Sequence, residues 1–253
     1  MPAARATRHA LHALALALVL GTVALLLGCA SPAPTPRGEV KGSPANHGEL
    51  AQSELNRVAT LAMRDNLHSL MRLAGKLYRR NPSQWRMGGA ASREQALARI
   101  QSAIDLRQTW PTLQGRRDID AMAFAMSREF VGDRVAALIM ATVDMLVTAH
   151  GGKTAFYLLD NIDAQHIYNA ARNIEIAAWI LAQRRDDRGA PLLLADDIAA
   201  DGTRNLSFER EFGKIIARLD LLAELADERL RRAAINYVQS LLGAGLLQFL
   251  PVR

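Results

Sequence analysis

Over most of the chain after its first 48 residues, apolar residues recur at the spacing of one helix face. In the first of these segments, Met63, Leu67 and Leu70 form an apolar stripe, and charged residues fill the other faces. Spacings of three and four residues are typical of amphipathic α-helices. The pattern predicts a helix over residues 49–80, which ends before Pro82 because proline cannot continue the backbone hydrogen bonds.

The same periodicity predicts further helices, some of which begin at recognisable capping residues. Ser92 followed by Gln95 is the pattern of a capping box, and Asp163 is a good N-cap. No alternating run of strand length and no repeat stands out. We therefore expect an all-α single domain of six or seven helices. The expected helices span residues 92–108, 117–130, 133–149, 163–185 and 207–243, the last loosened by Gly243 and Gly245, with an ambiguous short segment at 191–199.

The segment 133–149 is apolar on all its sides, which predicts that it is the central helix and that the others surround it. It is too short, and with Asp144 in its middle too polar, to span a bilayer. A buried carboxylate has to be paired, hydrogen-bonded or protonated. Asp144 is therefore either half of a structural ion pair, with Arg134 or Arg172 as its partner, or part of a functional site.

The first 28 residues have the parts of a secretory signal. Arg5 and Arg8 are followed by an almost wholly apolar stretch at 11–27 and then by Leu-Leu-Gly-Cys29. A positive start, an apolar stretch and small residues at the end are typical of a cleaved leader. The alternative is an uncleaved transmembrane helix over residues 13–30.

The tetrapeptide that ends at Cys29 resembles the lipobox of bacterial lipoproteins, and the resemblance covers only the first 29 residues. It implies that the leader 1–28 is removed and that Cys29 carries lipid, whose acyl chains anchor the protein stably to a membrane. Position 30 is Ala and not Asp, which in this family implies the outer membrane. Residues 29–48 hold the lipidated cysteine and a proline-rich, extended tether, and residues 49–253 form the periplasmic helical domain.

Composition excludes several classes of protein. With 50% apolar and 22% charged residues the chain can bury a core, so it is not a disordered protein. A single cysteine excludes a disulfide framework and multi-cysteine metal sites. The formal net charge is +6, but basic and acidic residues mostly alternate, so we expect no nucleic-acid partner.

Two segments are candidates for binding. At about 100° per residue, one strip of the helix 163–185 holds a cation, a carboxylate and two aromatic residues. This strip either lines a groove or is locked in a helix-helix contact. The segment 78–86 interleaves aromatic and basic residues, so it either forms a surface for phosphate-bearing lipids, acidic glycans or a protein, or simply ends a helix. The strip consists of Tyr168, Arg172, Glu175 and Trp179, and the basic-aromatic surface of Tyr78, Arg79, Arg80, Trp85 and Arg86.

Metal and catalytic signals are weak. The pairs Asp65–His68 and Asp163–His166 have the three-residue spacing of di-iron bundles, but those use glutamates and further inward-facing acids. We therefore expect no metal and no cofactor. No G-x-S-x-G, H-E-x-x-H or P-loop motif occurs. The apolar run 241–250 either completes the core or forms a surface for a partner.

Together these patterns suggest a non-enzymatic lipoprotein that is anchored to the outer membrane and serves as a scaffold or assembly component for an envelope protein partner. An alternative is a small-ligand or lipid-binding helical module with a pocket near Asp144, Arg172 and Glu175. An enzyme of the cell envelope, acting through the same residues, is a third.

Overall fold

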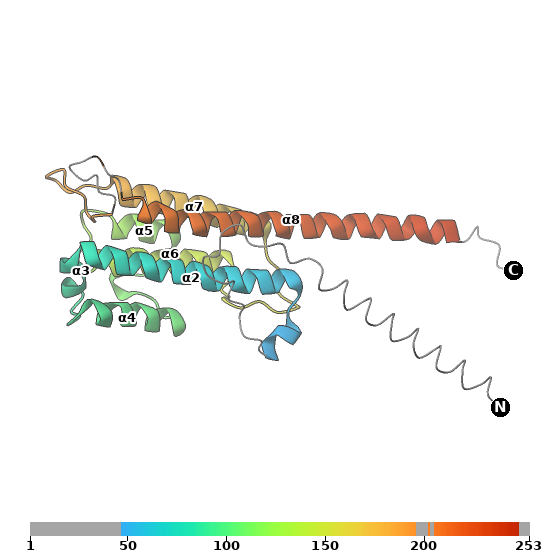
Figure 1. The fold of residues 1–253 in the computed structure, drawn as a ribbon, viewed down its shortest axis with the longest axis horizontal. Helices are drawn as coiled ribbons and strands as arrows, with labels where there is room; N and C mark the ends of the chain where they lie inside the picture. Colours follow the sequence, from blue (N-terminus) through green and yellow to red (C-terminus); the bar gives the residue numbers. More distant parts are fainter. Residues whose placement is uncertain (1–46, 196–201, 203–204, 248–253) are drawn as a thin grey trace, which may run out of the picture. The chain divides into compact units, whose positions relative to one another are not determined.

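The computed structural model describes residues 47–195, 202 and 205–247 (Figure 1). These residues form seven α-helices, two 3₁₀ helices and no strand, which confirms the expected all-α fold. The predicted leader, Cys29 and most of the tether lie outside the described residues. In chain order the elements are η1 (His47–Ala51), α2 (Glu54–Arg80), α3 (Pro82–Met87), α4 (Arg93–Asp105), η2 (Pro111–Leu113), α5 (Asp118–Ala125), α6 (Arg134–Ala149), α7 (Ala164–Gln183) and α8 (Ser207–Leu247).

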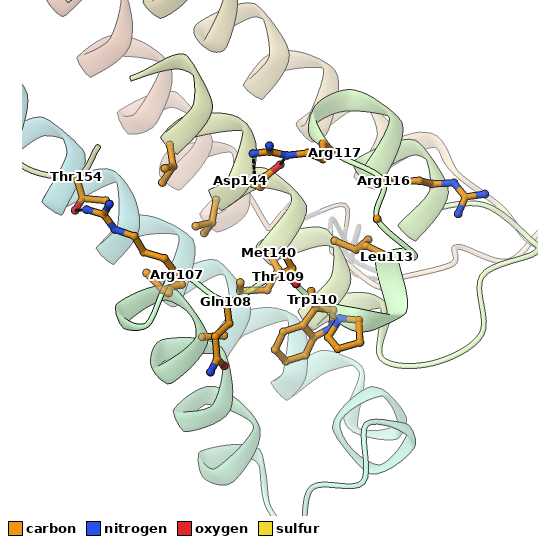
Figure 2. Close-up of a pocket in the computed structure, with 16 residues that line it drawn as sticks. Arg107, Gln108, Thr109, Trp110, Leu113, Arg116, Arg117, Met140, Asp144 and Thr154 are labelled. Atoms are coloured by element: carbon orange, nitrogen blue, oxygen red, sulfur yellow. Dashed lines mark hydrogen bonds and ion pairs between the residues drawn. The ribbon is translucent and has the colours of Figure 1, made fainter. Parts of the chain in front are cut away.

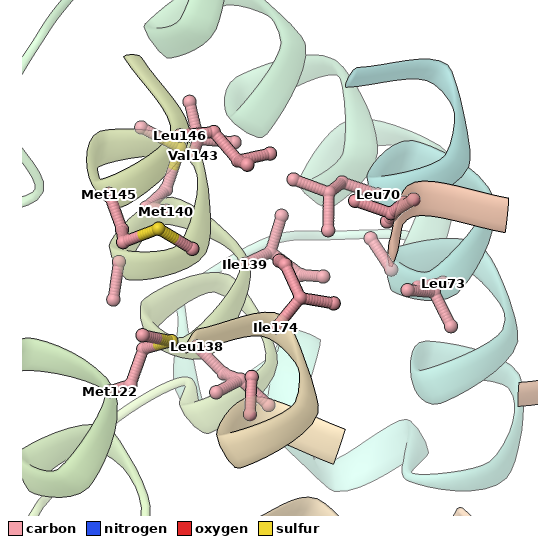
Figure 3. Close-up of a cluster of buried hydrophobic side chains, with 14 of the residues drawn as sticks. Leu70, Leu73, Met122, Leu138, Ile139, Met140, Val143, Met145, Leu146 and Ile174 are labelled. Carbon is pink, nitrogen blue, oxygen red and sulfur yellow. The ribbon is translucent and has the colours of Figure 1, made fainter. Parts of the chain in front are cut away.

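Helix α6 lies at the centre, as its apolar sequence predicts. It begins after Asp133, whose carboxylate accepts the N–H of Ala136 at 3.0 Å, and it packs against α2, α3, α4, α5, α7 and η2. Figure 3 shows Ile139 of α6 between Leu70 of α2 and Ile174 of α7. Burying such side chains contributes about 1.5–3 kcal/mol each, so the buried apolar residues of α6 stabilise the core substantially.

Several helix boundaries differ from the prediction because capping residues act at positions that periodicity does not mark. The expected helix 49–80 is interrupted, since Ser53 caps α2 by accepting the N–H of Asn56. Pro82 does not only end α2 but also starts the short α3, where its missing N–H costs nothing. Helix α4 stops at Asp105, before Arg107 turns into the left-handed region at φ 52°.

Helix α8 continues further than predicted. It runs through Gly243 and Gly245 to Leu247, so the predicted end near Gly243 is four residues too early. In the ambiguous segment 191–199, the described residues up to 195 form no helix. The first half of α8 packs against α7 and α2, and in Figure 1 the helix then runs on past both of them.

Candidate functional site

The first half of α8 buries an apolar stripe. Its apolar residues recur at three- and four-residue spacing, which places them on one face toward α2 and α7. Beside the stripe, the buried carboxylate of Glu211 accepts hydrogen bonds from Arg72 at 3.0 Å and from Lys214 at 3.1 Å. The stripe consists of Phe208, Phe212, Ile215, Leu219, Leu222, Ala223 and Ala226.

The same stripe continues beyond Ala226, but there nothing in the described structure covers it. Leu230, Tyr237 and Leu241 keep the spacing of the buried face, yet their exposed fractions are 60%, 66% and 56%. No residue from 227 to 241 is buried. We call residues 227–241 the free segment of α8. An apolar stripe in this position is the usual mark of an interaction site.

The five charged residues of the free segment lie at its beginning, between Asp227 and Arg232, and three of them are paired with one another. Arg231 donates to Glu228 at 2.6 Å, and Arg232 donates to the same carboxylate at 2.9 Å. These two hydrogen bonds lower the pKa of Glu228 to about 2. From Ala233 to Leu241 no side chain carries a charge. The far part of the free segment is therefore uncharged and keeps an apolar face.

The predicted strip on α7 is on the surface, where its residues separate into two places. Arg172 donates to both oxygens of Asp220 at 2.8 and 2.9 Å and contacts Glu175 at 3.2 Å. Its guanidinium also lies 4.9 Å from the ring centre of Tyr168. Trp179 is exposed and lies in a different depression, beside Arg128, Arg184 and Arg185. The strip is therefore not one groove: Tyr168, Arg172 and Glu175 lie at the surface where α7 contacts α8, and Trp179 lies apart from them.

Asp144 is paired, but not with either expected partner. Arg117 donates to its two oxygens at 3.1 and 2.7 Å, whereas Arg172 bonds Asp220 and Arg134 bonds backbone carbonyls. The hydrogen bond and charge of Asp144 raise the pKa of Arg117. The pair lies at the rim of a pocket of about 390 Å³ between α4, α6 and the loop that contains η2 (Figure 2). Arg172 and Glu175 are not among the residues that line this pocket.

The basic-aromatic segment is only partly a surface, because Tyr78 is buried. Its hydroxyl donates to Asp133 at 2.6 Å, and burial raises the pKa of Tyr78 and of Asp133. Trp85 is half-buried against the core, with the exposed Arg86 stacked 4.7 Å from its ring centre. Arg79 is exposed and Arg80 is half-buried. The expectation of a continuous surface therefore fails at Tyr78, which is part of the core.

The described residues show no site that could hold a metal ion. They contain no group of three or more His, Cys, Asp or Glu side chains that lie close enough together to bind one ion. His68 lies 4.0 Å from Asp65 and is mostly exposed, and His166 is exposed near the start of α7. None of the described helices has the length and hydropathy needed to cross a membrane.

Comparison with known proteins does not identify the chain: no family model, no curated protein and no solved structure matches it. The site therefore rests on geometry alone. Sequence reasoning missed the free segment, although its signal was present as an apolar stripe that continues without charges from Ala233. It expected a pocket near Asp144, Arg172 and Glu175 as an alternative, whereas the pocket beside Asp144 lies away from the other two residues and depends on how the loop 106–117 folds over α6.

Proposed function

We propose that this protein is a lipid-anchored scaffold of the bacterial envelope, and that the free segment of α8 holds a helix of another envelope protein. In this proposal the domain has no catalytic activity of its own. Its role is to keep a partner at the periplasmic face of the outer membrane.

One observation carries the partner-binding part of the proposal. The stripe that is buried at Leu219 and Ala226 continues at Leu230 and Tyr237 with the same spacing, but without a covering helix in the described structure. Helices α2 and α7 cover the first part of this stripe. The second part has the same pattern, so an apolar helix from another chain is the occupant that fits it best.

Charge favours a protein helix over an anionic bilayer as the occupant. Amphipathic helices that lie on such membranes carry Lys and Arg along the polar face, where they meet lipid phosphates. In the free segment the cations lie only at the beginning: Arg231 and Arg232 are both paired with Glu228, Arg229 lies between them and Asp227, and no cation follows up to Leu241. From Ala233 onward the apolar face therefore lacks the electrostatic attraction that would direct it to lipid.

The lipobox resemblance at Cys29 supports the anchoring part of the proposal. If Cys29 is lipidated, mass spectrometry of the protein from its native membrane finds a chain that begins at residue 29 and carries acyl groups. The Cys29→Ala variant should then lose its fractionation with the outer membrane. An intact Met1 end together with an unmodified thiol would contradict this part of the proposal.

Photocrosslinking in living cells tests partner binding. A photoreactive amino acid replaces Tyr237 on the apolar face or, as a matched control, Gln239 on the opposite face of the same helix. The proposal predicts one reproducible adduct at position 237, which peptide mapping assigns to an apolar helix of a different protein, and no such adduct at 239. Equal crosslinking at both positions, or adducts with lipid or a second copy only, would overturn it.

A further inference from the structure

The pocket beside Asp144 has the form of a ligand site. Its walls come from α4, α6 and the loop 106–117, and apolar side chains line most of it (Figure 2). Ile104, Met140 and Val143 are nearly buried there, while Trp110 and Val147 are partly exposed. Ligand pockets in proteins typically have volumes of about 300–1,000 Å³ and apolar walls with a few polar groups. At about 390 Å³ this pocket falls within that range.

The polar groups at the rim are mainly cationic. Arg107 donates to the carbonyl of Gly152 and to Thr154 only over 3.3 Å, so these bonds hold it weakly. Arg117 uses Nε and Nη2 for Asp144 and Thr148, which leaves Nη1 without a hydrogen-bond partner among the described residues. Figure 2 shows Arg107 and the Arg117–Asp144 pair on different sides of the apolar floor. One carboxylate and three arginines line the pocket, and one of these, Arg116, points away from the floor in Figure 2, so the rim has excess positive charge.

The loop that forms the rim is conformationally strained. Among the described residues other than glycine, positive φ angles occur at Arg107, Gln114 and Asp118, at 52°, 55° and 52°. All three lie within or directly beside the loop 106–117. Such conformations cost about 1–3 kcal/mol each and cluster at ligand-binding sites, where the surrounding structure maintains them. Here they hold Arg107 and Arg117 at opposite ends of the same loop.

We propose that this pocket binds a single-chain anionic amphiphile: the apolar chain lies on Met140, Val143 and Trp110, and the anionic head contacts Arg107, while Arg117 on the other side of the floor adds to the positive charge of the rim. A cavity of about 150 Å³ holds one benzene ring, so this pocket has space for roughly ten to fifteen carbon atoms. The head is a carboxylate or a phosphate, both of which an arginine binds through charge-assisted hydrogen bonds. This site is independent of the partner surface on α8.

Isothermal titration calorimetry with defined probes tests the chemical class. The protein is the mature chain, residues 29–253, with Cys29→Ser so that no lipid or detergent competes. Dodecanoate represents a free acid and lauroyl lysophosphatidylglycerol a lipid headgroup; dodecanol and dodecyltrimethylammonium are the uncharged and cationic controls. We expect at least one anionic probe to bind with a stoichiometry of one, and both controls to bind at least about tenfold more weakly, because they lose a charge-assisted hydrogen bond. Whichever anionic probe binds more tightly identifies the source of the ligand.

Four variants locate the site. Val147→Phe should fill the pocket and abolish binding, and Arg107→Gln should weaken it about tenfold. Asp144→Asn releases Arg117 and removes the negative charge, so it should strengthen binding a few-fold. Arg79→Gln removes one exposed charge from the end of α2 and should leave binding unchanged. Because Arg107 and Asp144 are at the rim, their variants remain informative even if Val147→Phe fails to fold.

Three results would overturn the proposal. The first is equal binding of the anionic, uncharged and cationic probes, since this would mean that the rim does not select charge. The second is no binding of either anionic probe. The third is an Asp144→Asn variant that binds an anionic probe more weakly than the wild type, because removing a negative charge from the rim should favour an anionic head.

Discussion

The two halves of helix α8 have the same apolar spacing but opposite environments. From Phe208 to Ala226 the stripe is buried, and from Leu230 to Leu241 it is exposed. The change occurs where the covering helices begin. Ser53 and Glu54, at the start of α2, lie beside Leu225 and Arg229, and the first residues of α7 likewise lie beside the stretch 223–227 of α8.

This contrast shows that amphipathic periodicity specifies a helix with an apolar face, while neighbouring elements decide whether that face is core or interface. Covering an apolar stripe stabilises the fold by about 25 cal/mol for each Å² of apolar surface removed from water. The same stripe without a cover does not contribute this free energy. The account therefore predicts that equivalent substitutions in the two halves have very different effects on stability.

The largest difference is expected for Leu219 and Leu230. Leu219→Ala removes a fully buried side chain and leaves a cavity, so the free energy of unfolding should fall by about 3 kcal/mol. Leu230→Ala removes an exposed side chain and should change it by less than about 0.5 kcal/mol. Urea denaturation of both variants measures this. Similar losses would show that another part of the molecule covers the free segment.

The next largest difference in stability is expected between substitutions of Glu211, in the covered half of α8, and of Glu228, in the exposed half. Burial raises the pKa of Glu211, but the bonds from Lys214 and Arg72 outweigh it and lower the pKa overall. A carboxyl group with a lowered folded pKa stabilises the fold above its unfolded pKa of about 4.5, and this contribution is lost as the pH falls through the folded pKa.

Glu211→Gln should therefore cost about 1–2 kcal/mol at pH 7, and the difference from the wild type should shrink as the pH drops below about 4.5. Glu228→Gln, in the exposed half, should leave the urea midpoint at pH 7 unchanged, since Glu228 and its partners face water. A Glu211→Gln effect that does not change with pH would mean that size, and not charge, matters there.

A smaller effect is expected where α7 and α8 meet at the surface. Arg172 and Asp220 form a bidentate pair, but both side chains are more than a third exposed. Asp220→Asn should therefore cost only about 0.5–1 kcal/mol, and Glu175→Gln should cost less, because Glu175 makes a single longer contact with Arg172. Thermal unfolding of both variants in low and high salt checks this order. The loss of stability in each variant should be smaller in high salt, because salt screens the charges.

The smallest effect on stability is expected for Tyr237→Ser, which changes the exposed face that we assign to the partner. The free energy of unfolding should stay within about 0.5 kcal/mol of the wild type, because the side chain is mostly in water. In cells the same variant should lose the adduct formed by a photoreactive residue at position 241. Retention of that adduct would show that Tyr237 is not part of the interface.

What the sequence predicts well is local. The central position of α6 follows from its apolar residues, and the start of α7 follows from Asp163, whose carboxylate accepts the N–H of His166. These features depend on neighbours along the chain, so periodicity and capping rules identify them. Tyr78 likewise shares a face with Leu70 and Leu77, which indicates the core better than its basic neighbours indicate a surface.

What the sequence does not predict depends on tertiary packing. The partner of Asp144 is Arg117, which belongs to a loop 27 positions earlier, and no spacing rule selects it over Arg134. The pocket exists only because the loop 106–117 crosses α6 in a strained conformation. In the same way, the apolar stripe of α8 does not show where α2 and α7 stop covering it.

Thiol labelling at position 237 tests the central claim most directly. The chain has one cysteine, and its predicted lipidation leaves an introduced Tyr237→Cys as the single free thiol. We predict that this thiol is protected from a membrane-permeant maleimide in intact cells and reacts once the protein is purified, while Gln239→Cys reacts in both. If both positions react equally in cells, the free segment has no partner, and the scaffold account is wrong.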